Sequence, residues 1–256
     1  MAQQIKSEFH RMKHELRTAI LVDGGFYRKR AAALWGHKTP AERAEELELY
    51  CKKHLNNKYE NRYLYRIFYY DCPPSGKNVH NPRTQKTVNL SKTTQYIWST
   101  DFIKELKHRR KFALRMGRLS EQQLEYTIKQ DTVKKLFRNE ISISELTDSD
   151  LELHIEQKGV DMRIGIDISS LAFKHQVEQI ILISGDSDFV PAAKQARREG
   201  IDFILDPMKA SIKDDLFEHI DGILSPRMYE DTITNEIQEA QEALAQVAVT
   251  VEDTDD

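Results

Sequence analysis

Four aspartates occupy positions in the sequence where carboxylates could carry out metal chemistry. Asp23 closes the apolar segment AILVD, Asp186 and Asp188 follow the segment QIILIS, and Asp161 lies in the turn KGVD. Each alone could cap a turn or a helix, because Asp accepts hydrogen bonds from free backbone N–H groups. Together the four would repel one another, and a divalent cation relieves such repulsion. Hard oxygen ligands suit magnesium or manganese. The pattern therefore predicts that the four aspartates are catalytic and bind a metal ion that promotes hydrolysis of a phosphodiester.

Three further side chains lie close to these aspartates in the sequence. Ser184 ends the segment before Asp186, where its hydroxyl could bind a ligand or only a turn. Lys158 could meet a phosphate, although a solvated turn is the commoner role. Asp167 follows Asp161 by six residues, which on a helix turns it about 120° away from that face. We therefore expect Asp167 to play a structural or supporting role.

The segments that carry the aspartates have the pattern of strands in a parallel sheet. The segments AILVD, RYLYRIFYYD and QIILIS would place apolar side chains on both faces of a strand, which is typical of strands covered by helices on both sides. The aromatic residues of RYLYRIFYYD are expected in the core rather than on a base-stacking surface. Helical segments are expected at 26–34, 41–55, 96–110, 121–138, 160–171, 190–199 and 212–220, and further strands at 111–119, 151–156, 201–206 and 222–224. Residues 71–93 are expected to form a long loop.

This alternation predicts an α/β domain with a mainly parallel sheet. In such sheets ligands bind beyond the carboxyl ends of the strands, which is where Asp23, Asp186 and Asp188 fall.

Charge is distributed unevenly along the chain. The total of 38 Lys and Arg against 41 Asp and Glu gives a net charge of −3, but residues 230–256 hold nine acidic side chains and no basic one. The rest of the chain is therefore basic, which is compatible with a polyanionic partner. The basic run at 104–118 and the loop at 77–92 could contact RNA phosphates, or they could be ordinary solvated surface. The candidate RNA-binding residues are Lys107, Arg109, Arg110 and Arg115.

Several classes of protein are disfavoured by what the sequence lacks. Its apolar runs are too short to span a membrane, and its N-terminus has no apolar signal region. Cys51 and Cys72 lack zinc-site spacing and suit a reducing compartment, so we expect a soluble, cytoplasmic protein. The phosphate-binding, dinucleotide and zinc-protease motifs are absent.

The sequence also resembles a known family. The segments AILVDGGFY, KGVDMRIGIDI and IILISGDSDFVPAAKQARREG resemble, in this order, the motifs of the NYN domain, a PIN-like group that includes the LabA-type proteins. The resemblance extends over residues 18 to about 226. It implies a three-layer α/β/α sandwich and a metal-dependent ribonuclease, with Asp23, Asp161, Asp186 and Asp188 as the acidic metal site. The chain departs from the family pattern at Phe26, where many members carry Asn.

These observations together predict the organisation and function of the chain. We expect a polar leader at 1–17, an NYN domain at 18–229 with an insertion at about 120–150, and a helical or disordered acidic tail at 230–256. The predicted function is an endoribonuclease that uses Mg²⁺ or Mn²⁺, with RNA as its partner and no membrane association. The alternative is a non-catalytic RNA-binding or regulatory module. The sequence leaves the oligomeric state open, including a homodimer.

Overall fold

The computed structural model describes residues 15–56, 60–120 and 124–228 of the chain. Most of the expected leader, and all of the expected tail at 230–256, lie outside these residues. The described chain contains a six-stranded sheet in which all neighbouring strands run parallel. In spatial order the strands are β12 (Gly222–Ile223), β11 (Asp202–Asp206), β10 (Gln179–Ile183), β1 (Glu15–Asp23), β2 (Asn61–Asp71) and β5 (Phe112–Met116).

The central strands are apolar in both directions because each face of the sheet is covered by helices. On β1, Ala19 and Leu21 belong to one buried cluster, whereas Ile20 and Val22 belong to the cluster on the opposite face. All four side chains are fully buried. This alternation satisfies the period of two in a strand while leaving no polar face.

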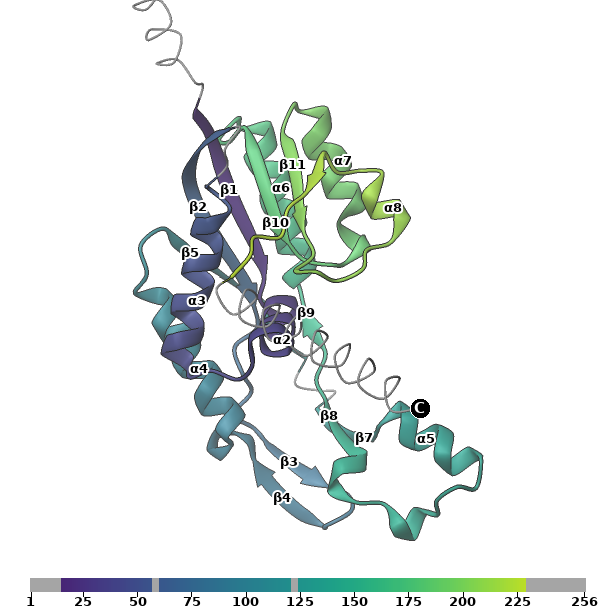
Figure 1. Cartoon of the computed structure of the whole chain (residues 1–256). Helices are drawn as coiled ribbons and strands as arrows, with labels where there is room; N and C mark the ends of the chain where they lie inside the picture. Colours follow the sequence, from purple (N-terminus) through teal and green to yellow (C-terminus); the bar gives the residue numbers. More distant parts are fainter. Residues whose placement is uncertain (1–14, 57–59, 121–123, 229–256) are drawn as a thin grey trace, which may run out of the picture.

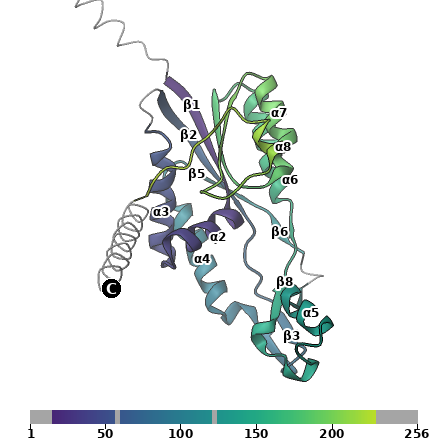
Figure 2. The ribbon, with the colours of Figure 1, turned by 45° about the vertical axis from the view of Figure 1, so that its right-hand side comes forward.

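Two layers of helices enclose the sheet (Figures 1 and 2). One face is covered by α2 (Gly24–Trp35), α3 (Pro40–Lys53) and α4 (Thr94–Lys107). The other is covered by α6 (Val160–Phe173) and α7 (Val190–Arg198), with the short α8 (Asp214–Phe217) beside them. The predicted three-layer α/β/α sandwich is thereby confirmed. We call the sheet and these six helices the body.

A second, smaller unit extends from the body (Figure 1). It combines the hairpin of β3 (Asn78–Asn81) and β4 (Lys86–Asn89) with a second antiparallel pair, β7 (Glu125–Ile128) and β8 (Leu151–His154), whose connection contains α5 (Gln130–Phe137). Contacts between β3 and β7 join the two strand pairs, and Arg83 Nε donates to Asp148 Oδ1 at 2.7 Å. The short pair β6 (Arg118–Leu119) and β9 (Gln157–Lys158) connects this unit to the body. We call residues 78–89 and 124–154 the lobe.

Two expectations about this region are wrong. Residues 71–93 are not a continuous loop, since they contain the β3–β4 hairpin. Its turn is held by Asn81 Oδ1, which accepts from the backbone N–H groups of Arg83 at 2.9 Å and Thr84 at 3.1 Å. Residues 121–138 are not one helix, because β7 pairs with β8 before α5 begins at Gln130. Both errors arise from tertiary pairing of short strands that have no long apolar pattern.

No helix in the described parts of the chain is long and apolar enough to cross a membrane.

Candidate active site at the carboxyl ends of β1 and β10

The point where the sheet changes winding direction lies between β1 and β10. After β1 the chain passes through α2 and α3 on one face, whereas after β10 it passes through α7 on the other. Adjacent parallel strands whose following helices cover opposite faces leave a crevice beyond their carboxyl ends. Asp23 closes β1 and Ser184 directly follows β10, so both residues lie at this crevice.

Asp23 is held in place by two hydrogen bonds. Its Oδ1 accepts from the backbone N–H of Phe26 at 3.1 Å, which caps α2, and its Oδ2 accepts from the Ser184 hydroxyl at 3.4 Å. Ser184 is fully buried, and its Oγ also accepts from the backbone N–H of Asp186 at 3.3 Å. Ser184 therefore links the carboxylate at the end of β1 to the acidic turn after β10.

Two glycines allow the surrounding segments to approach closely. A Cβ at Gly24 would lie 2.4 Å from Tyr69 Oη, so only glycine lets α2 begin this close to β2. A Cβ at Gly185 would lie 2.8 Å from the Phe26 ring. Phe26, the residue at which the chain departs from the family pattern, therefore packs onto the acidic turn itself.

Asp186, Asp188 and Asp161 lie on the solvent side of the crevice. Asp186 caps the short turn Ser187–Phe189, because its Oδ1 accepts from the backbone N–H of Asp188 at 3.0 Å. Asp188 and Asp161 line the same groove between α6 and α7. The structure thus brings all four predicted aspartates to one edge of the molecule.

The four carboxylates influence one another electrostatically. Burial, and to a lesser extent repulsion from Asp161, raises the pKa of Asp23 above its ordinary value. Partial burial, followed by repulsion from Asp186 and Asp188, raises the pKa of Asp161. Within the described ranges, however, no group of three or more His, Cys, Asp or Glu side chains is close enough to hold a metal ion. The acids form an open row along the edge rather than a closed set of ligands.

A fifth acid at this edge, Asp71, was not expected from the sequence. Asp71 closes β2 and is buried, with the Tyr69 hydroxyl donating to its Oδ2 at 2.8 Å and Arg28 forming an ion pair at 2.9 Å. Asp71 also contributes to the raised pKa of Asp23, after burial and Asp161. A signal was present, because RYLYRIFYYD ends in Asp as AILVD does, and neighbouring parallel strands end at the same edge.

The secondary candidates have other partners. Asp167 Oδ2 accepts from the Tyr70 hydroxyl and from Arg115 Nε, both at 2.9 Å, so Asp167 ties α6 to β2 and β5. Lys158, on β9, pairs with Glu156 at 3.3 Å. Neither side chain joins the row of acids.

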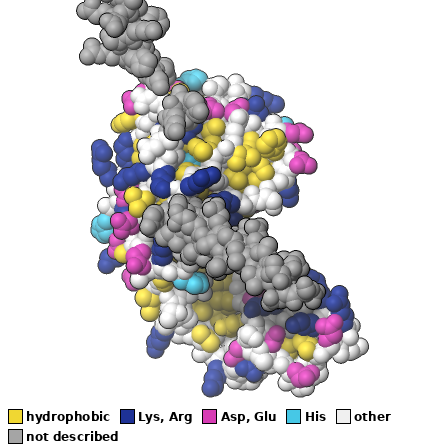
Figure 3. All heavy atoms as spheres, in the orientation of Figure 1, with side chains coloured by type: hydrophobic (Ala, Val, Ile, Leu, Met, Phe, Trp, Pro, Cys, Tyr) yellow, Lys and Arg dark blue, Asp and Glu magenta, His cyan; other side chains and the backbone are white. Residues whose placement is uncertain are grey.

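The part of the basic run that precedes β5 is not brought to the acids, whereas Arg115 lies near the carboxyl end of β5 and pairs with Asp167. Lys107 ends α4, and Arg109 and Arg110 lie in the turn before β5, which is at the amino end of the parallel sheet. Arg109 pairs with Glu48. The cations at the acidic edge include Arg28 and Lys213, whose Nζ donates to Ser187 Oγ at 3.2 Å. In the view of Figure 3, Lys and Arg side chains occur on both body and lobe, interspersed with acidic ones.

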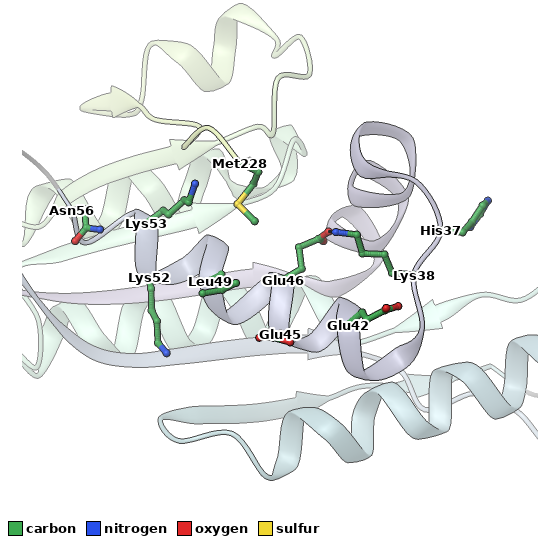
Figure 4. A pocket seen from close by; sticks show the side chains of 10 residues that line it. All are labelled: His37, Lys38, Glu42, Glu45, Glu46, Leu49, Lys52, Lys53, Asn56 and Met228. Atoms are coloured by element: carbon green, nitrogen blue, oxygen red, sulfur yellow. Dashed lines mark ion pairs between the residues drawn. The ribbon is translucent and has the colours of Figure 1, made fainter. Parts of the chain in front are cut away.

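A cavity of about 700 Å³ on the outer face of α3 contains none of the predicted site residues (Figure 4). Its wall includes Leu49 and Met228, and its Lys38 and Glu46 form an ion pair at 2.8 Å. We do not assign the chemistry to it, because it lies on the face of α3 and not at the strand ends.

The chain is similar to a solved structure and to a known domain family. A solved crystal structure of a protein of unknown function from Vibrio parahaemolyticus is similar with 12% identity and a TM-score of 0.39, covering 83% of this chain and 94% of that one. No curated protein matches. The NYN domain family model matches residues 75–224, which is more than half of the chain and includes Asp161, Asp186 and Asp188. The chain therefore belongs to the NYN domain family, part of the PIN-like nuclease superfamily.

Proposed function

We propose that the protein is an endoribonuclease that requires Mg²⁺ or Mn²⁺, with Asp23, Asp161, Asp186 and Asp188 as its metal-binding and catalytic acids. The observation that carries the proposal is the link from Asp23 through Ser184 to the Asp186 turn at the β1–β10 crevice. This is the position at which open α/β sheets bind ligands. Membership of the NYN family supports the same chemistry.

The donor set fits a hard divalent cation. All four acids offer carboxylate oxygens, and a cation would relieve the repulsion between them, which adds to burial in raising the pKa of Asp23 and of Asp161. Magnesium usually takes one or two protein carboxylates and completes its shell with water and substrate phosphate. An open row of acids can therefore serve it without a closed cage. When bound, such an ion neutralises phosphate charge and makes water more acidic.

The chain's own groups have distinct parts in this proposal. Asp23 is kept in one orientation by Phe26 and Ser184, so it presents a fixed oxygen to the crevice. Arg28 and Lys213 supply positive charge on either side of the acids, and we assign to them the contacts with substrate phosphates. Contacts from Lys107, Arg109 and Arg110 would require an RNA long enough to reach the amino end of the sheet.

A non-catalytic RNA-binding or regulatory module is the second candidate. Two observations favour it. The described residues do not gather three metal ligands, and position 26, where many family members carry Asn, is a Phe whose ring packs on Gly185. The two candidates differ in one respect, since only the enzyme changes the length of its RNA.

Incubation of the purified full chain with labelled single-stranded and structured RNAs tests the proposal. Parallel reactions would contain Mg²⁺, Mn²⁺ or EDTA. Internal cleavage with either metal and none with EDTA is the expected result. Intact RNA in every reaction, together with measurable RNA binding, would support the non-catalytic module instead.

A further inference from the structure

The acidic edge continues into a pocket between body and lobe. The pocket has a volume of about 260 Å³ and begins directly beyond the carboxyl ends of β2 and β5. Its lining comes from segments far apart in the sequence, including Arg28 on α2, Tyr96 and Ser99 on α4, Leu119 on β6 and Leu153 on β8. It exists because the lobe packs near the start of α4.

Arg28 connects this pocket to the acids. The guanidinium lines the pocket and also pairs with Asp71 at 2.9 Å. Asp71 closes the strand next to β1, whose last residue is Asp23. A chain of phosphates passing the acids would therefore come within reach of the pocket mouth.

The size and chemistry of the pocket suit one small planar group. Its volume is just below the roughly 300–1,000 Å³ of sites for drug-sized ligands. Leu119, Leu153 and the Tyr96 ring offer surfaces for stacking, while Ser99 and Gln157 offer a hydroxyl and an amide. Among the described residues that line it, Arg28 carries a charge and none is acidic. Enzymes that take up a displaced base combine stacking walls with polar groups in this way.

We propose that this pocket, which we call the interlobe pocket, receives one unpaired nucleobase of the RNA while the adjoining phosphates lie along the acidic edge. The inference rests on the proposed function for its choice of RNA, and it makes single-stranded RNA the preferred substrate class. A base held in a duplex cannot enter, because it is stacked and paired. The lobe thus acts as part of the substrate-binding surface.

Binding measurements in EDTA test this separately from cleavage. The probes are a short labelled single-stranded RNA and an oligomer of equal length made only of abasic spacers, which keeps the phosphates and removes the bases. We expect the intact chain to bind the RNA about tenfold more tightly than the abasic oligomer, as stacking of a base allows. Leu153→Trp should fill the pocket and remove this preference without changing affinity for the abasic oligomer.

Leu151→Trp is the matched control, because Leu151 is two residues away on the same half-buried face of β8 and does not line the pocket. A preference for RNA that persists in folded Leu153→Trp protein, or an equal loss for both oligomers, would overturn the proposal.

A milder pair of variants covers the case in which tryptophan disrupts the lobe. Gln95 lines the pocket in the first turn of α4, and Gln130 begins α5 away from it; both are exposed. Gln95→Ala should lower the preference for RNA severalfold and Gln130→Ala should not, whereas equal behaviour of the two would contradict the proposal. Because binding is measured without metal, a failure to cleave RNA in the separate reactions with Mg²⁺ or Mn²⁺ would refute the ribonuclease function without affecting this result.

Discussion

Alanine at Gly24 should destabilise the protein, whereas alanine at the neighbouring Gly25 should not. A Cβ at Gly24 would lie 2.4 Å from Tyr69 Oη and 2.6 Å from the backbone oxygen of Tyr70. Tyr69 is fully buried and its hydroxyl donates to Asp71, so it cannot swing away without breaking that bond. The Tyr70 oxygen belongs to the sheet. At Gly25, by contrast, the nearest atom to a Cβ is Asp23 Oδ1 at 3.5 Å, an ordinary contact.

The expected difference can be estimated from these contacts. Overpacking of a rigid site costs about 1–3 kcal/mol, and the backbone contact places Gly24 at the upper end. Alanine recovers roughly 0.5–1 kcal/mol relative to glycine in a helix, which leaves a net loss of about 2 kcal/mol for Gly24→Ala. For a domain of this size that corresponds to a fall in Tm of about 4–8 °C. Gly25→Ala should keep the wild-type Tm or raise it by roughly 1–3 °C.

Thermal and urea unfolding of the two variants beside the wild type measure this difference. The same displacement of α2 should also move Asp23, so Gly24→Ala should cleave RNA more slowly than Gly25→Ala. Equal stability of the two variants would refute the close packing of α2 on β2.

Three further predictions concern pH, RNA length and the C-terminal segment. Burial and Asp161 raise the pKa of Asp23 in the folded chain, so in this pH range the unfolded chain binds fewer protons than the folded chain. The free energy of unfolding should therefore fall as pH rises from the unfolded pKa of Asp23 to its folded pKa. Urea unfolding at a series of pH values should show a smaller fall in this free energy for Asp23→Asn than for the wild type, and identical pH profiles of the two proteins would contradict the prediction. Replacing Lys107 and Arg110 by Glu should weaken the binding of long RNA and flatten the salt dependence of that binding, but it should leave the binding of a short oligonucleotide unaffected. An equal loss of affinity for the long and the short RNA would place the short RNA at the amino end of the sheet. A chain ending at Tyr229 lacks nine acidic side chains and should bind RNA more tightly at low salt, with the gain fading as salt rises. Equal affinity of the two lengths at low salt would show that the segment does not compete with RNA.

The body was predictable from the sequence because its strands are buried on both faces. Segments such as AILVD and QIILIS have apolar side chains in both directions, which restricts them to a parallel sheet between helices. The polar residue that ends each segment then falls at the carboxyl edge. The grouping of Asp23 with Asp186 follows from these two facts alone.

The lobe was not predictable by the same reasoning. Its strands are each four residues long and mostly exposed or half-buried, and they are specified by pairing with each other rather than by an apolar pattern. The place of Asp71 at the acidic edge could have been read from the Asp that ends RYLYRIFYYD. Its ion pair with Arg28 could not, because it joins residues 43 apart and no spacing rule within one segment reveals such a contact.

Single-turnover cleavage of RNA by Asp23→Asn and Asp186→Asn, singly and combined, tests the central claim most directly. The control is Asp101→Asn, which removes one exposed carboxylate on α4. We expect the control to cleave as the wild type does with Mg²⁺ or Mn²⁺, and the site variants to lose about 100-fold or more. Their Tm should not fall, because removing a carboxylate relieves the repulsion within the acidic row. Near-wild-type cleavage by the double variant, in preparations free of contaminating nuclease, would contradict the assignment of the active site to the carboxyl ends of β1 and β10.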